Sequence, residues 1–325
     1  MLTAIALAGA GVASAAPNPL PVKTIFDTDM LDDCDDAGAL ATLNKLADLG
    51  EAEILACVVN GHGNEKASAA AVSAINTWYG RPQIPVGTNQ GPARGRTRSA
   101  YTSKLRDEFP HHALPDDQQP TALSIYRTAL ASAPDASVTI ISVGLFSNLS
   151  DLLKSQPDAI SPLSGPDLVR AKVKHLVAMG GGFPKGGGDY NFNSDSLATQ
   201  YAVANWPTPI LFSGAEIGWK VITGKPLVAT PASNPVRRAY ELHGNLRGGH
   251  QSWDLTAVLA AVRDPRLYWD VSPGGTCTVD PKGHDEWAPT PDRGHTYLIE
   301  KLPPADVAKV LDDLISMPPA PNKEK

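Results

Sequence analysis

The segment from Asp27 to Asp36 is the densest group of chemically active side chains in the sequence, because six of its ten residues are aspartates. Carboxylates this close repel one another, and a cation lying among them relieves the repulsion. Their oxygens prefer a hard ion such as Ca²⁺ or Mg²⁺, so the segment predicts a metal site. The alternative is a solvated acidic turn in which Asp35 or Asp36 caps a helix. An EF-hand is excluded, because the twelfth position counted from Asp27 is Gly38 and not a glutamate.

The residues on either side of this segment predict the elements that hold it. Residues 22–26 have the pattern of a short strand, and apolar residues over 37–49 keep helical spacing. Further strands are expected at 54–59, 138–143, 175–179 and 209–212, and further helices at 67–79 and around 149–153. This alternation predicts an α/β fold with an open, mostly parallel, doubly wound sheet and helices on both faces. Ligands of such sheets bind beyond the carboxyl ends of the strands, where the aspartate segment falls.

Composition divides the chain into three parts. Residues 1–16 form an apolar run that ends in small residues, which is typical of a secretory signal peptide, although a buried first helix is the alternative. The run is shorter than the ~20 residues that span a bilayer, so we expect a secreted or periplasmic protein without a membrane partner. Residues 17–316 are expected to form the domain, with a polar surface excursion over 91–119, and residues 317–325 a disordered tail.

Charge and cysteine content limit the partners. The net charge of −6 argues against nucleic acid, which usually requires a basic surface, and is compatible with a small neutral ligand. The three cysteines, Cys34, Cys57 and Cys277, match neither a disulfide framework nor the spacing of a zinc site. The sequence leaves open whether one disulfide forms and whether the protein is a homo-oligomer.

Several motifs, taken in order along the chain, resemble the inosine/uridine-preferring nucleoside hydrolase family. The aspartate segment resembles that family's opening signature, Asp-x-Asp-Pro-Gly-x-Asp-Asp-Ala, with a loop longer by two residues. Matching its ends assigns Asp29 to the second aspartate and Asp35 and Asp36 to the closing pair. The later segments that resemble family motifs are Gly61–Asn64, Val143–Leu149, Met179–Gly182, Asp189–Asp195 and Ser252–Val258. The resemblance covers most of the chain and implies a nucleoside or another riboside as the substrate.

The resemblance also implies a role for each matched residue. The implied calcium ligands are Asp29, Asp36, Asp254 and the backbone carbonyl of Ser147. The ion would lower the pKa of a water molecule, and Asp29 or Asp35 would take its proton as general base. The implied ribose-binding residues are Asn64, Asp189 and Asn191. The reaction would be hydrolysis of an N-glycosidic bond to ribose and a free base, through a transition state like a ribosyl oxocarbenium ion.

Most of these residues also have a purely structural interpretation. Asn64, Asp189 and Asn191 are of types that favour turns, and Asp254 could cap a helix. Trp253 stands where the family's catalytic histidine protonates a departing purine. Indole is not a strong acid but can stack on a base, so we predict that Trp253 binds substrate. His62, His243 and His250 lie near the predicted rim of the sheet and receive no role.

Two other functions stay open at this point. Residues 25–29 also fit the strand and Asp-x-Asp of a haloacid-dehalogenase-type phosphatase, although Leu31 stands where that class has Thr or Val. The other is a secreted calcium- and sugar-binding protein of the same fold without efficient turnover, which the tryptophan at position 253 favours. A nitrophenyl riboside, whose leaving group needs no acid, would separate this binding protein from an enzyme.

Overall fold

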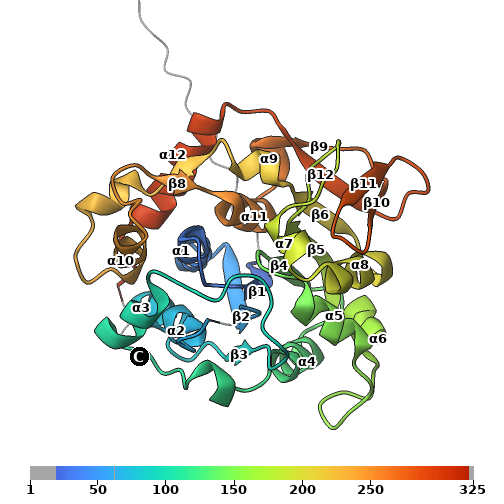
Figure 1. Cartoon of the computed structure of the whole chain (residues 1–325), viewed down its shortest axis with the longest axis horizontal. Coiled ribbons are helices and arrows are strands. Elements are labelled where there is room, and N and C mark those ends of the chain that lie inside the picture. The colour runs from blue at the N-terminus through green and yellow to red at the C-terminus, as the bar shows by residue number, and fades with distance from the viewer. Residues whose placement is uncertain (1–19, 62, 322–325) are drawn as a thin grey trace, which may run out of the picture.

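The protein is described by a computed structural model, which covers residues 20–61 and 63–321. Its centre is an eight-stranded sheet with the strand order β3-β2-β1-β4-β5-β6-β12-β9 (Figure 1). The strands are β1 Val22–Thr28, β2 Ala52–Val59, β3 Val86–Thr88, β4 Val138–Ser142, β5 Val173–Met179, β6 Ile210–Ser213, β9 Trp269–Val271 and β12 His295–Glu300. All neighbours are parallel except β12 and β9. The predicted open, mostly parallel sheet is therefore confirmed.

Helices cover both faces of the sheet, as the alternation of strand and helix patterns predicts (Figure 1). One face carries α1 Asp35–Asp48, α2 Ser68–Trp78, α3 Thr102–Glu108, α10 Pro235–Leu242, α11 Trp253–Val262 and α12 Pro304–Ser316. The other carries α4 Ala122–Ser132, α5 Ser147–Lys154, α6 Gly165–Lys172 and α8 Ser196–Asn205. Successive strand residues point to opposite faces, so Ile25 packs in one core and Phe26 in the other. Both faces are buried, which explains why the strands are apolar runs without alternation.

Short elements complete the chain around the carboxyl edge of the sheet. They are α7 Tyr190–Ser194, α9 Ala215–Gly218, the 3₁₀ helices η1 Asp116–Gln118, η2 Lys225–Ala229 and η3 Pro265–Leu267, and the strand pair β7 Ile222–Thr223 and β8 His250–Gln251. A hairpin of β10 Thr276–Val279 and β11 Asp285–Ala288 packs beside α8. The sequence analysis did not predict β3, β9, β12 or this hairpin, because these strands are short or carry polar residues.

The structure adds detail to two segments predicted to be irregular. The excursion over 91–119 lies mostly exposed on the surface, contains α3 and η1, and is anchored by the fully buried side chain of Tyr101. The described part of the expected disordered tail, residues 317–321, packs on α1, where the Pro318 carbonyl accepts a hydrogen bond from Lys45 (2.8 Å). The predicted signal peptide over 1–16 lies outside the described residues. Within the described chain, no helix is long and apolar enough to span a membrane.

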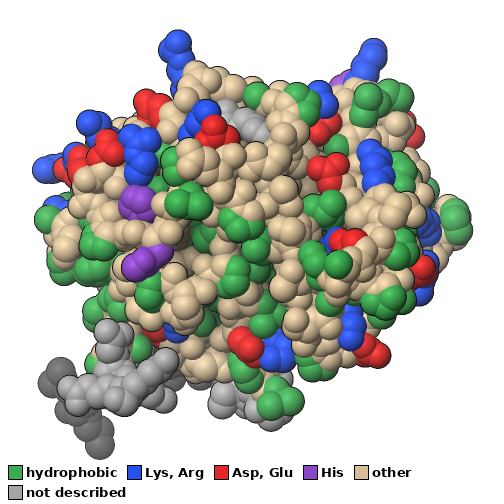
Figure 2. All heavy atoms as spheres, turned by 90° about the horizontal axis from the view of Figure 1, so that it is seen from below, with side chains coloured by type: hydrophobic (Ala, Val, Ile, Leu, Met, Phe, Trp, Pro, Cys, Tyr) green, Lys and Arg blue, Asp and Glu red, His purple; other side chains and the backbone are tan. Residues whose placement is uncertain are grey.

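The strand order locates the place where a ligand is expected. In a doubly wound sheet the order in which strands are added reverses between two central strands, here the parallel neighbours β1 and β4, and ligands bind in the crevice beyond their carboxyl ends. Elsewhere on the molecule charges of both signs are mixed: on the face in Figure 2, basic and acidic side chains lie scattered among neutral ones. The concentrated negative charge of residues 27–36 lies at the crevice instead.

Candidate active site

The backbone around Asp29 is held tightly at the end of β1. A Cβ atom on Gly61 would lie 2.1 Å from the carbonyl oxygen of Asp29, and one on Gly144 would lie 2.4 Å from its nitrogen. Only glycine permits this approach from the loops that follow β2 and β4. The next residue, Met30, has a φ of +37° and turns the chain away from the strand direction. The sequence thus places the Asp29 carboxylate at the reversal point of the sheet.

The six aspartates of the opening segment divide into three groups, and Asp27 stands by itself below the crevice. Its carboxylate is fully buried and accepts hydrogen bonds from Asn60 (2.7 Å), Asn148 (2.9 Å) and Tyr126 (2.7 Å). Burial raises the pKa of Asp27 to about 7, although these hydrogen bonds act to lower it. Since Asn60 also accepts from the Leu145 amide, Asp27 ties the ends of β1, β2 and β4 together.

A second group of carboxylates faces the crevice, and we call it the acidic wall: Asp29, Asp35, Asp36 and Asp254. Carboxylate oxygens of Asp35, Asp36 and Asp254 lie within 4.8 Å of one another. Asp35 and Asp36 are the first two residues of α1, and Asp254 is the second residue of α11. None of the three is the N-cap residue of its helix, so the predicted capping alternative does not account for them.

The acidic wall is electrostatically unfavourable without a cation. Burial raises the pKa of all four carboxyl groups, and the charges of neighbouring aspartates raise it further. Few protein groups offset this: Asp36 accepts from the Met30 amide (3.0 Å) and the Thr28 hydroxyl, and Asp35 accepts from the Asp254 amide (3.2 Å). Oxygen donors arranged in this way suit a hard divalent cation. The residues present therefore fit the metal that the sequence predicts.

The third group, Asp32 and Asp33, lies at the mouth of the crevice and is only half buried. Arg96, which belongs to the excursion, forms an ion pair with Asp32. The guanidinium of Arg96 also lies over the ring of Tyr190, 4.9 Å from the ring centroid. The backbone amide of Arg96 donates a hydrogen bond to the Tyr190 hydroxyl (2.7 Å). The sequence analysis gave no role to either residue: Arg96 lies in no motif, and Tyr190 lies within the motif Asp189–Asp195 without being assigned.

A cavity of about 280 Å³ opens beside the acidic wall. Its remaining lining comes from Asp32, Asp33, Arg96, Val143, Met179, Asp189, Tyr190, Asn191, Ala215, Trp219 and Trp253. The sequence-predicted residues Asp29, Asp35, Asp36, Asp189, Asn191, Trp253 and Asp254 all meet here. Their positions in the chain span more than two hundred residues, and the parallel sheet brings them to one edge.

Asp189 and Asn191 form a second side of the cavity, which we call the loop wall. Asp189 caps α7 and accepts hydrogen bonds from the amides of Gly181 (3.0 Å), Asn191 (3.3 Å) and Phe192 (3.1 Å). Burial raises the pKa of Asp189 to about 6, while these amides act to lower it. The Asn191 side-chain nitrogen donates to the carbonyl of Val143 (2.9 Å), which fixes the orientation of its carboxamide.

The glycine-rich loop over 180–188 carries Asp189 and is anchored from outside the cavity. The buried carboxylate of Asp285, on the hairpin, accepts from the amides of Gly182 (3.3 Å) and Gly188 (2.7 Å). A Cβ atom on Gly186 would lie 2.0 Å from the Asp285 carbonyl oxygen, so the loop fits against the hairpin only with glycine at this position. Asp285 is a positioning residue that the sequence analysis missed.

Two tryptophans form an aromatic edge of the cavity. The Trp253 ring lies 5.7 Å from the ring of Trp219, at an interplanar angle of 53°, and Trp219 is 62% exposed. The indole N–H of Trp253 donates to the Ala215 carbonyl (3.0 Å) and is therefore not free to donate to a ligand. These rings can offer a stacking surface but no acid.

Two predicted site residues lie outside the cavity. Asn64 is exposed and lines a separate depression, where its backbone N–H donates to the Thr97 carbonyl (2.8 Å). Ser147 is the first residue of α5, so its carbonyl belongs to the hydrogen-bonding pattern of that helix, and its hydroxyl donates to Asp195 (2.8 Å). Val143, directly after β4, lines the cavity instead. Both assignments depended on short motifs whose register could shift by a few residues.

Comparison with known proteins agrees with this geometry. The sequence profile described as inosine-uridine preferring nucleoside hydrolase matches residues 24–313. The chain belongs to this family. The resemblance inferred from the motifs is therefore confirmed, and the phosphatase alternative is not supported. The family membership supports nucleoside hydrolysis in general.

Solved structures show that the fold is shared at low sequence identity. The effector protein XOO4466 is 17% identical, with a TM-score of 0.68 over 94% of this chain and 95% of that chain. The type III effector protein XopQ, complexed with adenosine diphosphate ribose, is also 17% identical, with a TM-score of 0.67 over 94% and 95%. An inosine-guanosine nucleoside hydrolase is 20% identical, with a TM-score of 0.68 over 90% and 98%. The inosine-uridine preferring nucleoside hydrolase from Bacillus anthracis is 15% identical, with a TM-score of 0.64 over 90% and 99%. No curated protein sequence matches the chain closely enough to add to these comparisons.

Proposed function

We propose that this nucleoside hydrolase family member is a calcium-dependent enzyme that cleaves the N-glycosidic bond of ribonucleosides, outside the cytoplasm. One observation carries the proposal: the acidic wall and the loop wall face the same cavity of about 280 Å³, which is of the size of a small ligand. The apolar run over 1–16 supports export.

The acidic wall supports the choice of a calcium ion. Asp29, Asp36 and Asp254 would hold the cation, and Val143 lines the cavity beside them. Donor atoms that are all oxygen, several of them carboxylate, favour Ca²⁺ over softer ions. When bound, such an ion supplies positive charge that orients sugar hydroxyls and acidifies a water molecule.

The protein's own residues activate the water, orient the ribose and stabilise the charge that develops on it. Asp29 or Asp35 takes a proton from the attacking water as general base. Asp189 and Asn191 orient the ribose hydroxyls, and their geometry is held by backbone amides and carbonyls. Positive charge develops on the sugar as the bond lengthens, and the surrounding carboxylates stabilise it. Asp35→Asn separates the two candidates, because Asp35 is not one of the cation-holding residues: a lower kcat with unchanged calcium binding assigns the base to Asp35, and an unchanged kcat assigns it to Asp29.

The base-binding side supports stacking without acid catalysis. Trp253 and Trp219 can hold a purine or pyrimidine ring, but the Trp253 N–H is already bonded to Ala215. Loss of a positioned acid typically lowers the rate by a factor of roughly 10² to 10⁴. We therefore expect nitrophenyl riboside to be cleaved much faster than inosine.

A reducing-sugar assay tests the proposal directly. The purified protein would be given a panel of ribonucleosides and nitrophenyl riboside, with calcium and with a chelator. We expect release of ribose that depends on calcium and requires both the 2′- and 3′-hydroxyls. Absence of ribose release from every substrate at saturating calcium would contradict the enzyme proposal.

A binding protein without efficient turnover is the second candidate. The occupied N–H of Trp253 favours it, and so does the likeness to the effector XopQ, whose structure contains adenosine diphosphate ribose. This candidate predicts calcium-dependent binding of ribosides, measured by calorimetry, together with no cleavage of nitrophenyl riboside. Cleavage of that activated substrate would rule it out.

A further inference from the structure

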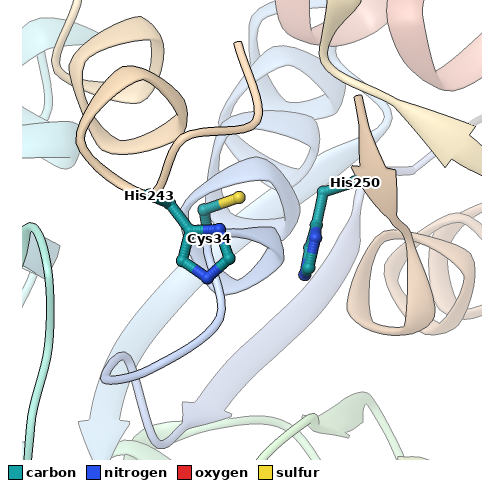
Figure 3. Close-up of side chains that lie close together, drawn as sticks. All are labelled: Cys34, His243 and His250. Atoms are coloured by element: carbon teal, nitrogen blue, oxygen red, sulfur yellow. The ribbon is translucent and has the colours of Figure 1, made fainter. Parts of the chain in front are cut away.

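A second cluster of metal-ligating side chains lies next to the acidic wall and is not used by the proposed reaction. Cys34 directly precedes α1, His243 follows the end of α10, and His250 belongs to β8. The sulfur of Cys34 and one ring nitrogen of each histidine lie within 4.8 Å of one another. Figure 3 shows the Cys34 sulfur directed toward the gap between the two imidazole rings. The fold alone creates this cluster, because Cys34 is far from both histidines in the chain.

Asn245 holds the two imidazole rings in place. Its carboxamide lies 2.9 Å from Nδ1 of His243 and 2.7 Å from Nδ1 of His250. The ring centroids are 4.9 Å apart. For metal binding the carboxamide oxygen must face the rings and accept a hydrogen bond from each Nδ1–H, which leaves Nε2 of each ring without a proton. A group that fixes two histidine rings in this way is typical of the outer shell of a metal site.

His250 provides an independent indication of a missing ligand. Its Nε2 atom is buried and has no hydrogen-bond partner among the described residues, and Asp33 Oδ1 lies 3.5 Å away. The Nε2 atom of His243 lies 3.7 Å from the same oxygen. Buried polar atoms almost always have well-formed partners, so an imidazole nitrogen whose nearest acceptor is this long contact to Asp33, in a cluster of donors, points to a bound group.

The other two cysteines show what an ordinary buried thiol looks like in this protein. Cys57 accepts a long contact from the Asn76 side chain (3.6 Å), and Cys277 lies on β10. Within the described chain, neither belongs to a group of three potential ligands, whereas Cys34 does. Burial in the core therefore explains Cys57 and Cys277 but leaves the two histidines beside Cys34 unexplained.

We propose that Cys34, His243 and His250 form a second metal site, selective for Zn²⁺ or a similar thiophilic ion. A thiolate with two imidazoles suits zinc, while the neighbouring carboxylates suit calcium, so the two sites differ in donor chemistry. His243 is only half buried, which leaves a route for the ion and room for a water molecule as fourth ligand. On binding, the Cys34 thiol releases its proton to solvent and the sulfur donates its electron pair to the ion.

Occupancy of this site would join the start of α1 to the segment 243–250. Asp33 lines the active-site cavity and also lies close to both histidines, so it connects the two sites. Zinc is therefore expected to stiffen the loop over 31–34 at the mouth of the cavity. Because the site uses none of the proposed calcium ligands, it does not depend on the proposed reaction.

Zinc titration tests the proposal. Metal-free protein at saturating calcium would compete with a chromogenic zinc chelator. We expect one tight zinc ion per chain. Cys34→Ala and His243→Ala should each weaken binding by more than about 100-fold, and Asn245→Ala by roughly 10- to 100-fold, as for an outer-shell group. Cys57→Ala and His284→Ala, which change the same residue types elsewhere, should bind zinc like the parent.

Cobalt gives a readout that does not depend on stability. Co²⁺ bound to a thiolate has a near-ultraviolet charge-transfer band, which we expect in the parent and in Cys57→Ala but not in Cys34→Ala. His243 is partly exposed, so His243→Ala should fold with an unchanged melting temperature and still lose zinc. Unchanged zinc affinity in Cys34→Ala would assign the ion to other donors, such as Asp33, Asp35 and His250, and would overturn the proposal. Absence of the cobalt band from the parent would do the same.

Discussion

The acidic wall and the loop wall of the cavity use aspartates in opposite ways. In the acidic wall four carboxylates come from the residue directly after β1, from α1 and from α11, and few protein donors reach them. In the loop wall the single carboxylate of Asp189 accepts hydrogen bonds from three backbone amides. Neighbouring charges raise the pKa of the acidic-wall groups beyond the effect of burial, whereas amide donors oppose the effect of burial on Asp189.

This difference indicates which part of the site needs a metal. The loop wall is complete once the chain has folded, because the glycine-rich loop and Asp285 supply its partners. The acidic wall becomes favourable only when a cation offsets its charge. Removal of calcium should therefore affect the acidic wall and leave the loop wall intact, and the predictions below test this separation.

The largest effect is expected from Asp36→Ala and Asp254→Ala. Each should abolish calcium binding and, with it, nucleoside cleavage. Calcium at 100 times its Kd should stabilise the parent by about 2.7 kcal/mol, because a ligand of the native state opposes unfolding, and should not stabilise either variant. Differential scanning calorimetry with and without calcium measures this, with the exposed Asp270→Ala as control. If calcium raises the melting temperature of both variants as much as that of the parent, the acidic wall is not the metal site.

A smaller effect is expected from Asp189→Asn. Asparagine caps a helix about as well as aspartate, so α7 should remain in place while the charged acceptor is lost. A hydrogen bond to a charged group contributes about 1.5–3 kcal/mol, which predicts a decrease in kcat/KM of roughly 10- to 150-fold. Calcium should still raise the melting temperature by the parental amount. A loss of calcium binding in this variant would show that the two walls are not separate.

Trp253→His should change the substrate preference by a moderate amount. A histidine at this position could protonate a departing base, so inosine turnover should rise roughly tenfold, short of the 10²- to 10⁴-fold expected of a well-positioned acid. Turnover of nitrophenyl riboside should change little, because its leaving group needs no proton. Rapid inosine hydrolysis by the unmodified protein would instead reveal another acid.

The smallest effect concerns pH. A carboxyl group whose pKa is raised on folding stabilises the protein fully below its unfolded pKa of about 4, and that stabilisation is lost as pH rises through the raised value. With a chelator present, the protein should lose stability as pH rises, because the carboxyl groups of the acidic wall lose their protons. Deprotonation of Asp27 should add to this loss up to about pH 7. Calcium binds the deprotonated groups, so the difference in melting temperature between calcium and chelator should be larger at pH 8 than at pH 5.5. A difference that does not change with pH would contradict the assignment.

Burial of His175 and His295 should not disturb this comparison. Burial lowers the pKa of each to about 4, so their contribution to stability is lost as pH falls from about 6.5 toward 4. Both lie outside the cavity lining, so they affect the calcium-loaded and chelated protein equally. The difference between the two melting temperatures therefore isolates the acidic wall.

Local sequence patterns predicted much of the fold and most of the acidic wall. Apolar runs and helical spacing identified the central strands and the helices α1, α2 and α5, because each element buries its own stripe of side chains, but the pattern of α4, α8, α11 and α12 was not recognised. The acidic segment identified Asp29, Asp35 and Asp36 as neighbours, since a single tight loop holds them regardless of what packs around it. Short or polar strands such as β3, β9 and the hairpin gave too weak a pattern to recognise.

Contacts between distant segments could not be inferred in this way. Asp254 was placed with the acidic segment by the family resemblance and not by periodicity, and nothing in the sequence indicated that Arg96 reaches the mouth or that Asp285 lies under the glycine-rich loop. Asn64 and Ser147 do not line the cavity, because a shift of a few residues in a loop moves a side chain out of it. The pairing of Cys34 with His243 and His250 has no signature in the linear spacing of cysteines and histidines. Local periodicity follows from backbone geometry and burial, whereas the meeting of remote loops follows from strand order and helix packing, which no short stretch of sequence encodes.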